Sequence, residues 1–236
     1  KDLTKDIDNS IVDEVIVGNI LSAGHSQGIG RQASIYGGLP ESTVAYSINM
    51  LCGSGMKAVM NAITEIKAGE KEVIIAGGVE SMSAAPFLVS SKARAGLGLG
   101  ETKLIDSMSD ALVDAFEGYH MGITAENIAQ RFNITRDIQD EYAINSQKKA
   151  AIADDAGKFI DEITPITIKT RKGEIVFDKD EYINRNTSLE KLQKLRPAFK
   201  KDGTVTAGNA SGINDGASFT LIASEEAVKK YNLKPL

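Results

Sequence analysis

The strongest constraint on the fold is an alternation of short apolar segments with helices in the first third of the chain. Residues 11–21, 43–48 and 72–76 are rich in Val, Ile and Ala, which favours strands. Residues 30–36 and 56–68 separate them and have helical patterns. Strands that are joined through helices by short connections run parallel in one sheet. The predicted fold class is therefore α/β, with one mixed sheet packed by helices.

The helix at residues 56–68 has the clearest amphipathic pattern of the chain. It places Val59, Ile63 and Ile66 on one face, which we expect to be buried against the sheet. The strand that follows is expected to end at the glycine pair 77–78, because glycine weakens a strand interior.

The pattern changes after residue 83 and returns at residue 204. The intervening segment of about 120 residues is longer than an ordinary connection, and it contains helices at 122–132 and 136–157 and short strands around 163–170. A strand at 217–223 and a helix at 225–231 follow it. We therefore predict a core domain of residues 1–83 and 204–236, interrupted by an inserted α+β loop domain of residues 84–203.

The composition excludes several classes of function. There are 27 Lys and Arg against 32 Asp and Glu in 236 residues, which gives a net charge of −5 and none of the basic excess of a nucleic-acid surface. No apolar stretch approaches the roughly 20 residues of a membrane span. One cysteine and two histidines exclude a disulfide framework and a cysteine-based zinc site, and we expect no metal. A cytoplasmic protein in a reducing compartment is predicted.

The single cysteine, Cys52, lies at the junction between the second strand and the strong helix. Unpaired N–H groups and the positive end of the helix dipole favour a thiolate at such a place. Gly53 and Gly55 leave room for a substrate carbonyl to approach the sulfur. These features are typical of a nucleophile. The alternative is that Cys52 is a small buried apolar residue.

Five blocks of sequence together resemble the thiolase family, in its order and at its approximate spacings. They are distributed across nearly the whole chain. The blocks are Asn49–Gly55, Ala76–Ser83, Gly118–Asn127, Lys194–Phe199 and Thr206–Ala217.

This resemblance implies acyl transfer between coenzyme A thioesters. The cysteine that matches Cys52 is acylated in thiolases, and the enolate of a second acetyl-CoA then takes the acyl group. Coenzyme A and acetyl-CoA are thus expected as substrates, with no permanently bound cofactor. The resemblance also implies a layered thiolase-like fold, in which the inserted domain covers the CoA tail.

The resemblance further assigns binding roles in the inserted domain. His120 would contact the pantetheine arm and Met121 would line the acyl pocket, in a run that resembles the short-chain, acetoacetyl-CoA-forming branch. Leu112 and Phe199 would flank the same arm. We expect an acetyl-CoA C-acetyltransferase on this basis.

Three more residues are assigned in the same way. Ser211 and the backbone at Ala207 would hold an amide of the pantetheine arm. Arg185 lies one position from the place where the family often has an arginine against the adenine.

Two other interpretations of the motifs are weaker. Residues 28–33 satisfy a dinucleotide-binding fingerprint, but the acidic residue expected about 20 positions later is missing from residues 46–50. A cysteine hydrolase would need a histidine near Cys52, and neither His25 nor His120 lies in a recognisable context.

Several elements of the thiolase pattern have no match. The first strand, the C-terminal domain, its catalytic histidine and its second cysteine are not found, so a fragment that carries only the nucleophile is expected. The alternative function is a non-catalytic fragment that binds acyl-CoA or is acylated at Cys52 without turnover. Family members are homo-dimers or homo-tetramers, and residues 43–49 would lie near the dimer seam.

Overall fold

The computed structural model describes all 236 residues, which form two compact units. The first unit comprises residues 1–112 and 213–236, and the second comprises residues 113–212. Four short 3-10 helices also occur, at Asp2–Thr4, Asn9–Ile11, Met82–Ala84 and Ser91–Ala95.

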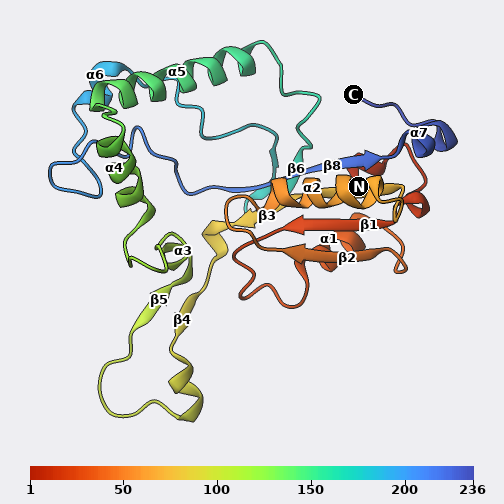
Figure 1. Cartoon of the computed structure of the whole chain (residues 1–236), viewed down its shortest axis with the longest axis horizontal. Helices are drawn as coiled ribbons and strands as arrows, with labels where there is room; N and C mark the ends of the chain where they lie inside the picture. Colours follow the sequence, from red (N-terminus) through yellow and green to blue (C-terminus); the bar gives the residue numbers. More distant parts are fainter. The chain divides into compact units, whose positions relative to one another are not determined.

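A four-stranded sheet in the order β2-β1-β3-β8 forms the centre of the first unit. The first three strands are parallel, and β8 is antiparallel to β3 (Figure 1). This mixed sheet confirms the α/β class. The strands are β1 (Glu14–Gly18), β2 (Val44–Ile48), β3 (Val73–Ser81) and β8 (Asp215–Ala223), and the helices are α1 (Ile29–Gly37), α2 (Ser54–Lys67), α3 (Ser107–Asp110) and α7 (Glu225–Tyr231).

Both faces of this sheet are covered by helices. Successive side chains of a strand point to opposite faces, so Val15 and Val17 pack in the core with α1 and α7, while Ile16 packs with α2. The residues of β1 are all buried. A central strand with two apolar faces explains the unbroken apolar run in the sequence.

The buried face of α2 differs from the expected one. Ala58 and Ala62 are fully buried against the sheet, with Val59 and Ile66 beside them, whereas Ile63 is 40% exposed. Small residues form the contact because the helix lies close to the strands, where larger side chains do not fit. The expectation that Ile63 belongs to the buried face was therefore wrong.

Strand β3 continues through the glycine pair instead of ending there. Gly77 and Gly78 pair with Phe219 and Ser218 of β8. A Cβ on Gly77 would lie 2.1 Å from the carbonyl oxygen of Ser218. The glycine pair therefore marks a close approach between backbones and not a strand end.

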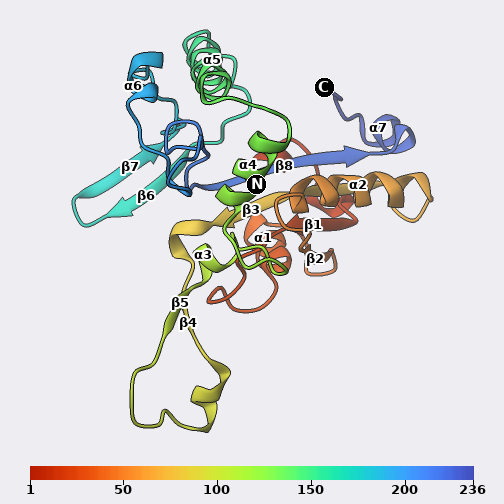
Figure 2. The ribbon, with the colours of Figure 1, turned by 60° about the vertical axis from the view of Figure 1, so that its left-hand side comes forward.

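The segment between β3 and the second unit forms an extended arm. Its strands β4 (Phe87–Val89) and β5 (Leu104–Asp106) pair antiparallel. Figure 2 shows this arm reaching away from the sheet of the first unit.

The second unit contains two long helices, a hairpin and a buried turn. Its elements are α4 (Met121–Arg131), α5 (Arg136–Asp155), β6 (Ile166–Thr170), β7 (Gly173–Phe177) and α6 (Leu189–Gln193). Both helices were expected from the sequence, and their bounds lie within two residues of the expected ones. No helix of the structure is long and apolar enough to span a membrane.

The unit boundaries differ from those expected for the core and the insertion. Residues 84–112 group with the sheet, whereas residues 204–212 group with the second unit. The second difference has a clear cause, because Glu126 of α4 accepts hydrogen bonds from the backbone of Thr204 and Val205. The CoA-binding role of the 84–203 segment stays a prediction.

Candidate active site

Cys52 lies on a tight turn between β2 and α2, at the carboxyl edge of the parallel strands. Helix α2 begins at Ser54 with Gly53 as its N-cap, so the cysteine is two residues before the first helical residue. Leu51 has a φ of 51°, a left-handed conformation that is rare for a bulky residue. Such backbone strain clusters at functional sites and requires support from its surroundings.

Hydrogen bonds supply that support on both sides of Leu51. The N–H of Leu51 donates to Asn49 Oδ1 at 3.0 Å. The hydroxyl of Ser54 accepts from Met50 N–H at 2.8 Å and donates to the carbonyl oxygen of Leu51 at 2.6 Å. The turn that carries Cys52 is thus held by its own polar side chains.

Glycines of the sheet allow the first turn of α2 to pack directly against it. A Cβ on Gly18, at the end of β1, would lie 2.5 Å from both the nitrogen of Gly55 and the carbonyl carbon of Ser54. A Cβ on Gly78 of β3 would lie 3.3 Å from Gly55 Cα. Any side chain at Gly18 would therefore push away the helix start beside Cys52. A Cβ on Gly55 itself would lie 3.7 Å from Gly78, an ordinary contact, and the expectation that Gly55 leaves room for a substrate stays a prediction.

The side chain of Cys52 is exposed. This finding contradicts the alternative interpretation of a buried apolar cysteine. No hydrogen bond joins the thiol to the ring of His25, the one histidine of the first unit. Cys52 is thus exposed, and its thiol has no hydrogen-bonding partner in this unit.

A second polar contact organises the same edge of the sheet. Glu80, near the end of β3, accepts from Asn19 Nδ2 and from the N–H groups of Ile20 and Leu21, all at 2.9–3.0 Å. The loop after β1 is thereby fixed. The sequence patterns did not single out this carboxylate, although it lies in the resembling block at residues 76–83.

The dinucleotide fingerprint has a structural explanation. The N–H of Gly30, in the first turn of α1, donates to Ser47 Oγ at 2.9 Å and is not available to a phosphate. A Cβ on Gly30 would lie 2.3 Å from the carbonyl oxygen of Tyr46. This glycine therefore serves helix–strand packing.

In the second unit, His120 and Phe199 form a stacked pair. Their ring centroids are 4.8 Å apart with an angle of 16° between the planes. His120 is the N-cap of α4, and its Nδ1 accepts from Gly122 N–H at 3.0 Å. A Cβ on Gly122 would lie 2.2 Å from the Phe199 ring, so this glycine makes the pair possible.

Ala207 and Ser211 lie on an irregular segment that the second unit holds in place. Glu126, which is 6% exposed, accepts from Thr204 N–H and Val205 N–H at 2.8 Å. Ser211 is exposed, and its hydroxyl donates to the carbonyl oxygen of Gly212 at 3.2 Å.

The pKa of Glu126 is raised by burial and lowered by hydrogen bonds and a neighbouring charge. Burial raises the pKa of the carboxyl, but hydrogen bonds from Val205 and Thr204 and the charge of Lys200 outweigh it, so the pKa lies below its ordinary value. The sequence patterns did not single out this residue, although it lies in the resembling block at residues 118–127.

An open groove of about 780 Å³ lies beside the Ala207 segment, within the second unit. It is lined by Ala207, Gly208 and Ala210, by residues of α5 and by the 181–187 segment. Arg185 also lines the groove, and its guanidinium pairs with Asp154 at 2.6 Å and Asp155 at 2.7 Å. The expected adenine partner is thus held by two carboxylates.

The remaining assigned residues are separated along the chain. Met121 is the first residue of α4 and is 38% exposed. Leu112 is partly buried at the end of the arm segment in the first unit. The structure brings His120 and Phe199 together, and it places Ala207 on the groove with Arg185.

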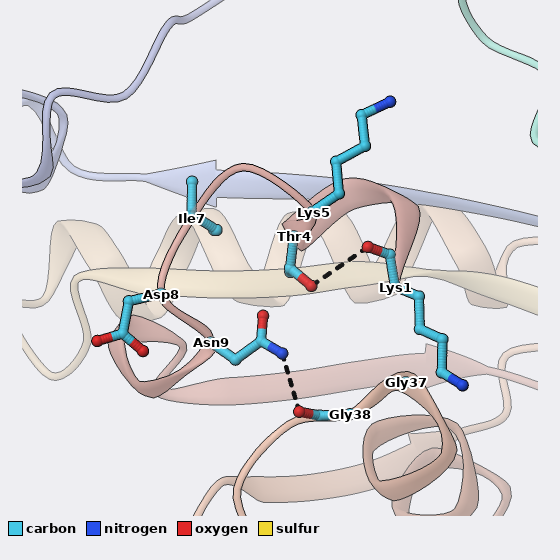
Figure 3. A pocket seen from close by; sticks show the side chains of 8 residues that line it. All are labelled: Lys1, Thr4, Lys5, Ile7, Asp8, Asn9, Gly37 and Gly38. Carbon is cyan, nitrogen blue, oxygen red and sulfur yellow. Dashed lines mark hydrogen bonds between the residues drawn. The ribbon is translucent and has the colours of Figure 1, made fainter.

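Another pocket of the first unit, of about 590 Å³, contains none of the assigned residues. Figure 3 shows Asn9 Nδ2 donating to the carbonyl oxygen of Gly38 and the hydroxyl of Thr4 facing the carbonyl oxygen of Lys1. Its other lining residues are Lys5, Ile7, Asp8 and Gly37.

The mixed sheet with helices on both faces defines a layered α/β protein, and comparisons define its family. Residues 2–226 match the family model described as "Thiolase, N-terminal domain". A probable acetyl-CoA acyltransferase of Staphylococcus aureus (strain COL) is 52% identical over 229 residues, which cover 96% of this chain and 58% of that protein.

Two solved structures agree with this match. The Bacillus anthracis acetyl-CoA acetyltransferase is 42% identical with a TM-score of 0.92, over 98% of this chain and 58% of that one. The human mitochondrial 3-ketoacyl-CoA thiolase is 46% identical with a TM-score of 0.92, over 97% and 58%. The chain belongs to the thiolase family and spans 58% of the length of these relatives. The predicted family and layered fold are confirmed.

Proposed function

We propose that this chain supplies the nucleophile for acyl transfer between coenzyme A thioesters. The reaction would convert two acetyl-CoA to acetoacetyl-CoA and CoA, or run in reverse, as in an acetyl-CoA C-acetyltransferase. One observation carries the proposal: the only cysteine of a thiolase-family chain is exposed on a braced, strained turn before α2.

The chemical step at Cys52 is a thioester exchange. The Cys52 sulfur attacks the carbonyl carbon of acetyl-CoA and forms a new C–S bond. The bond from that carbon to the CoA sulfur breaks, and CoA leaves with the proton that the Cys52 thiol has lost. Transfer of the acetyl group to a second acetyl-CoA enolate, or back to CoA, regenerates the thiol.

The second unit is proposed to bind the CoA tail. Because His120 Nδ1 accepts a hydrogen bond, the neutral ring carries its proton at Nε2, where it can be donated to the pantetheine arm. The groove beside Ala207 and Arg185 has the size of a small-molecule site. Coenzyme A and acetyl-CoA are substrates in this proposal, and no cofactor is permanently bound.

Turnover would require a proton acceptor for Cys52. The first unit offers no hydrogen-bonding partner to the thiol, and the relatives are longer than the chain. We propose that a region corresponding to their remaining length supplies this base. A homo-dimer or homo-tetramer is proposed as well, since β2 is an edge strand of the sheet, and a cytoplasmic location suits the unpaired thiol.

Isotope-labelled acetyl-CoA tests the proposal. The wild-type chain should carry the label on the peptide that contains Cys52, and added free CoA should remove it again. The Cys52→Ser variant is the matched control and should lose this exchangeable label. Label on lysines alone, or label on Cys52 that CoA cannot remove, would contradict the proposed acyl transfer.

A further inference from the structure

We infer that Asp140 is a positioning residue that sets the affinity of the second unit for the pantetheine part of its ligand. It acts through Asn209, which shapes the turn that carries Ala207. The inference rests on the proposed function for the identity of the ligand, and on the contacts of the second unit for the positioning.

Asp140 lies on α5 and is completely buried. Its Oδ2 accepts from Arg136 Nε at 2.7 Å, one helical turn away. The same guanidinium donates to the carbonyl oxygens of Leu192 and Leu195, the second of these at 3.1 Å, and thus anchors α6. A buried carboxylate requires such pairing, because an unpaired charge is costly away from water.

The other carboxylate oxygen of Asp140 holds Asn209, which is 69 residues away in the sequence. Asn209 Nδ2 donates to Asp140 Oδ1 at 2.9 Å and to the carbonyl oxygen of Thr204 at 3.1 Å. Asn209 Oδ1 accepts from Thr206 N–H at 2.7 Å. Both ends of the amide are therefore used to shape the turn from Thr204 to Asn209.

This turn is also packed closely on α6. A Cβ on Gly208 would lie 2.5 Å from Leu192 and 2.6 Å from Leu195, the residues whose carbonyl groups Arg136 binds. Thr206 is fully buried, whereas Ala207 is exposed and lines the groove. The buried polar contacts thus fix the backbone on which the groove wall is built.

Conservative exchanges can separate positioning from folding. In Asp140→Asn an NH2 group replaces one of the two carboxylate oxygens. This NH2 group then faces a donor, either the Arg136 guanidinium or the Asn209 side-chain NH2, and cannot accept from it. Asn209→Asp places two carboxylates against each other. The double variant restores a donor–acceptor pair between the two positions, and the amide oxygen introduced at position 140 still accepts from Arg136. The bond from position 209 to the carbonyl oxygen of Thr204 is not restored, because a carboxylate at position 209 has no proton to donate. Glu141→Gln removes an exposed charge from the adjacent position of α5 and is the matched control.

Two readouts are compared on the 236-residue chain. Calorimetry measures the affinity for CoA and for 3′,5′-ADP, which lacks the pantetheine arm. Each single variant should weaken CoA binding about tenfold and leave 3′,5′-ADP binding unchanged. The double variant should recover part of the loss, because the pair between positions 140 and 209 is restored and the bond to Thr204 is not. Hydrogen exchange should become faster at the amide of Thr206 in the single variants and return toward wild type in the double variant.

The outcomes separate this inference from the proposed function. Equal losses for CoA and 3′,5′-ADP, or a double variant no better than the single ones, would overturn the positioning role. So would unchanged exchange at Thr206 in Asp140→Asn, whether or not the ligand binds. A wild-type chain that binds no CoA would contradict the proposed function, and the exchange data would still decide the positioning claim.

Discussion

The two units hold their functional segments in different ways. In the first unit, Gly18 and Gly78 let the start of α2 approach the backbone of the sheet, which positions the turn of Cys52 by close packing. In the second unit, the buried carboxylates of Glu126 and Asp140 reach from α4 and α5 to hold an irregular turn. The first arrangement depends on the small volume of glycine, and the second depends on the charge of buried carboxylates.

This difference predicts that the two segments respond differently to added side-chain volume and to the loss of hydrogen-bond acceptors. The stability of the packed helix start beside Cys52 should not depend on the charge of a carboxylate, but it should fall when a methyl group is added at Gly18, since packed interiors have no spare space. The turn held by Glu126 and Asp140 should tolerate surface changes but not the loss of an acceptor oxygen. The predictions below run from the largest expected effect to the smallest.

Gly18→Val should have the largest effect. Its side chain would overlap the backbone of Ser54 and Gly55, which cannot move without displacing α2 from the sheet. We expect a loss of about 3 kcal/mol in the free energy of unfolding and slower alkylation of Cys52 by iodoacetamide.

Chemical denaturation checks this prediction, with Gly98→Val as the control because a Cβ on Gly98 meets open space. Equal free energies of unfolding of the two variants would show that the start of α2 does not depend on the absence of a side chain at Gly18.

Glu126→Gln should cost about 2 kcal/mol, because charge-assisted hydrogen bonds to Thr204 and Val205 are lost. Although burial raises the pKa of Glu126, its hydrogen bonds lower it overall, so the folded state binds fewer protons than the unfolded state. This contribution is fully present above the ordinary value of 4.5 and is lost as the pH falls through the lowered pKa.

Denaturation curves at several pH values measure this dependence. The difference between wild type and Glu126→Gln should shrink below pH 4.5. A difference that stays constant to lower pH would show that the carboxylate charge does not hold the turn.

Ser54→Ala should remove the brace of the Cys52 turn. The hydroxyl satisfies Met50 N–H and donates to Leu51 beside the left-handed φ. We expect a cost of about 1 kcal/mol and a slower reaction of Cys52 with iodoacetamide. If the stability falls and the reaction rate does not, the brace serves folding alone.

Glu14→Gln should have the smallest effect, with the opposite pH dependence to Glu126. Burial, and then the charge of Glu65, raise the pKa of Glu14 despite the ion pair with Lys71. The folded state therefore binds more protons than the unfolded state, and stability falls as the pH rises through the raised pKa.

The variant removes this contribution, so at neutral pH its stability should equal or exceed that of wild type by less than about 1 kcal/mol. A clear loss at pH 7 would show that the pair with Lys71 outweighs burial.

The sequence predicted the elements of the sheet but not how closely they pack. Strands β1 and β2 and the helix α2 follow from apolar patterns. The burial of Ala58 and Ala62 does not, because it depends on how closely the helix packs against Ile16, Ile74 and Ala76 of the strands. Strand β3 continues past its expected end because Gly77 and Gly78 pair closely with β8.

The sequence patterns located the candidate site better than its supports. Cys52, His120 and Phe199 were identified from blocks that resemble the family. Glu126 and Asp140 were not, because their partners lie 78 and 69 residues away and no periodic pattern links such positions.

The central proposal is that acetyl-CoA bound by this chain acetylates Cys52, and the rate of Cys52 acetylation tests it most directly. The rate should saturate with acetyl-CoA and should rise linearly with an acetyl thioester of a small thiol that lacks the CoA tail. Asn209→Asp should shift the concentration at half saturation by about tenfold and leave the reaction with the small thioester unchanged. A linear dependence on both thioesters, unaffected by this variant, would show that Cys52 is only an exposed thiol.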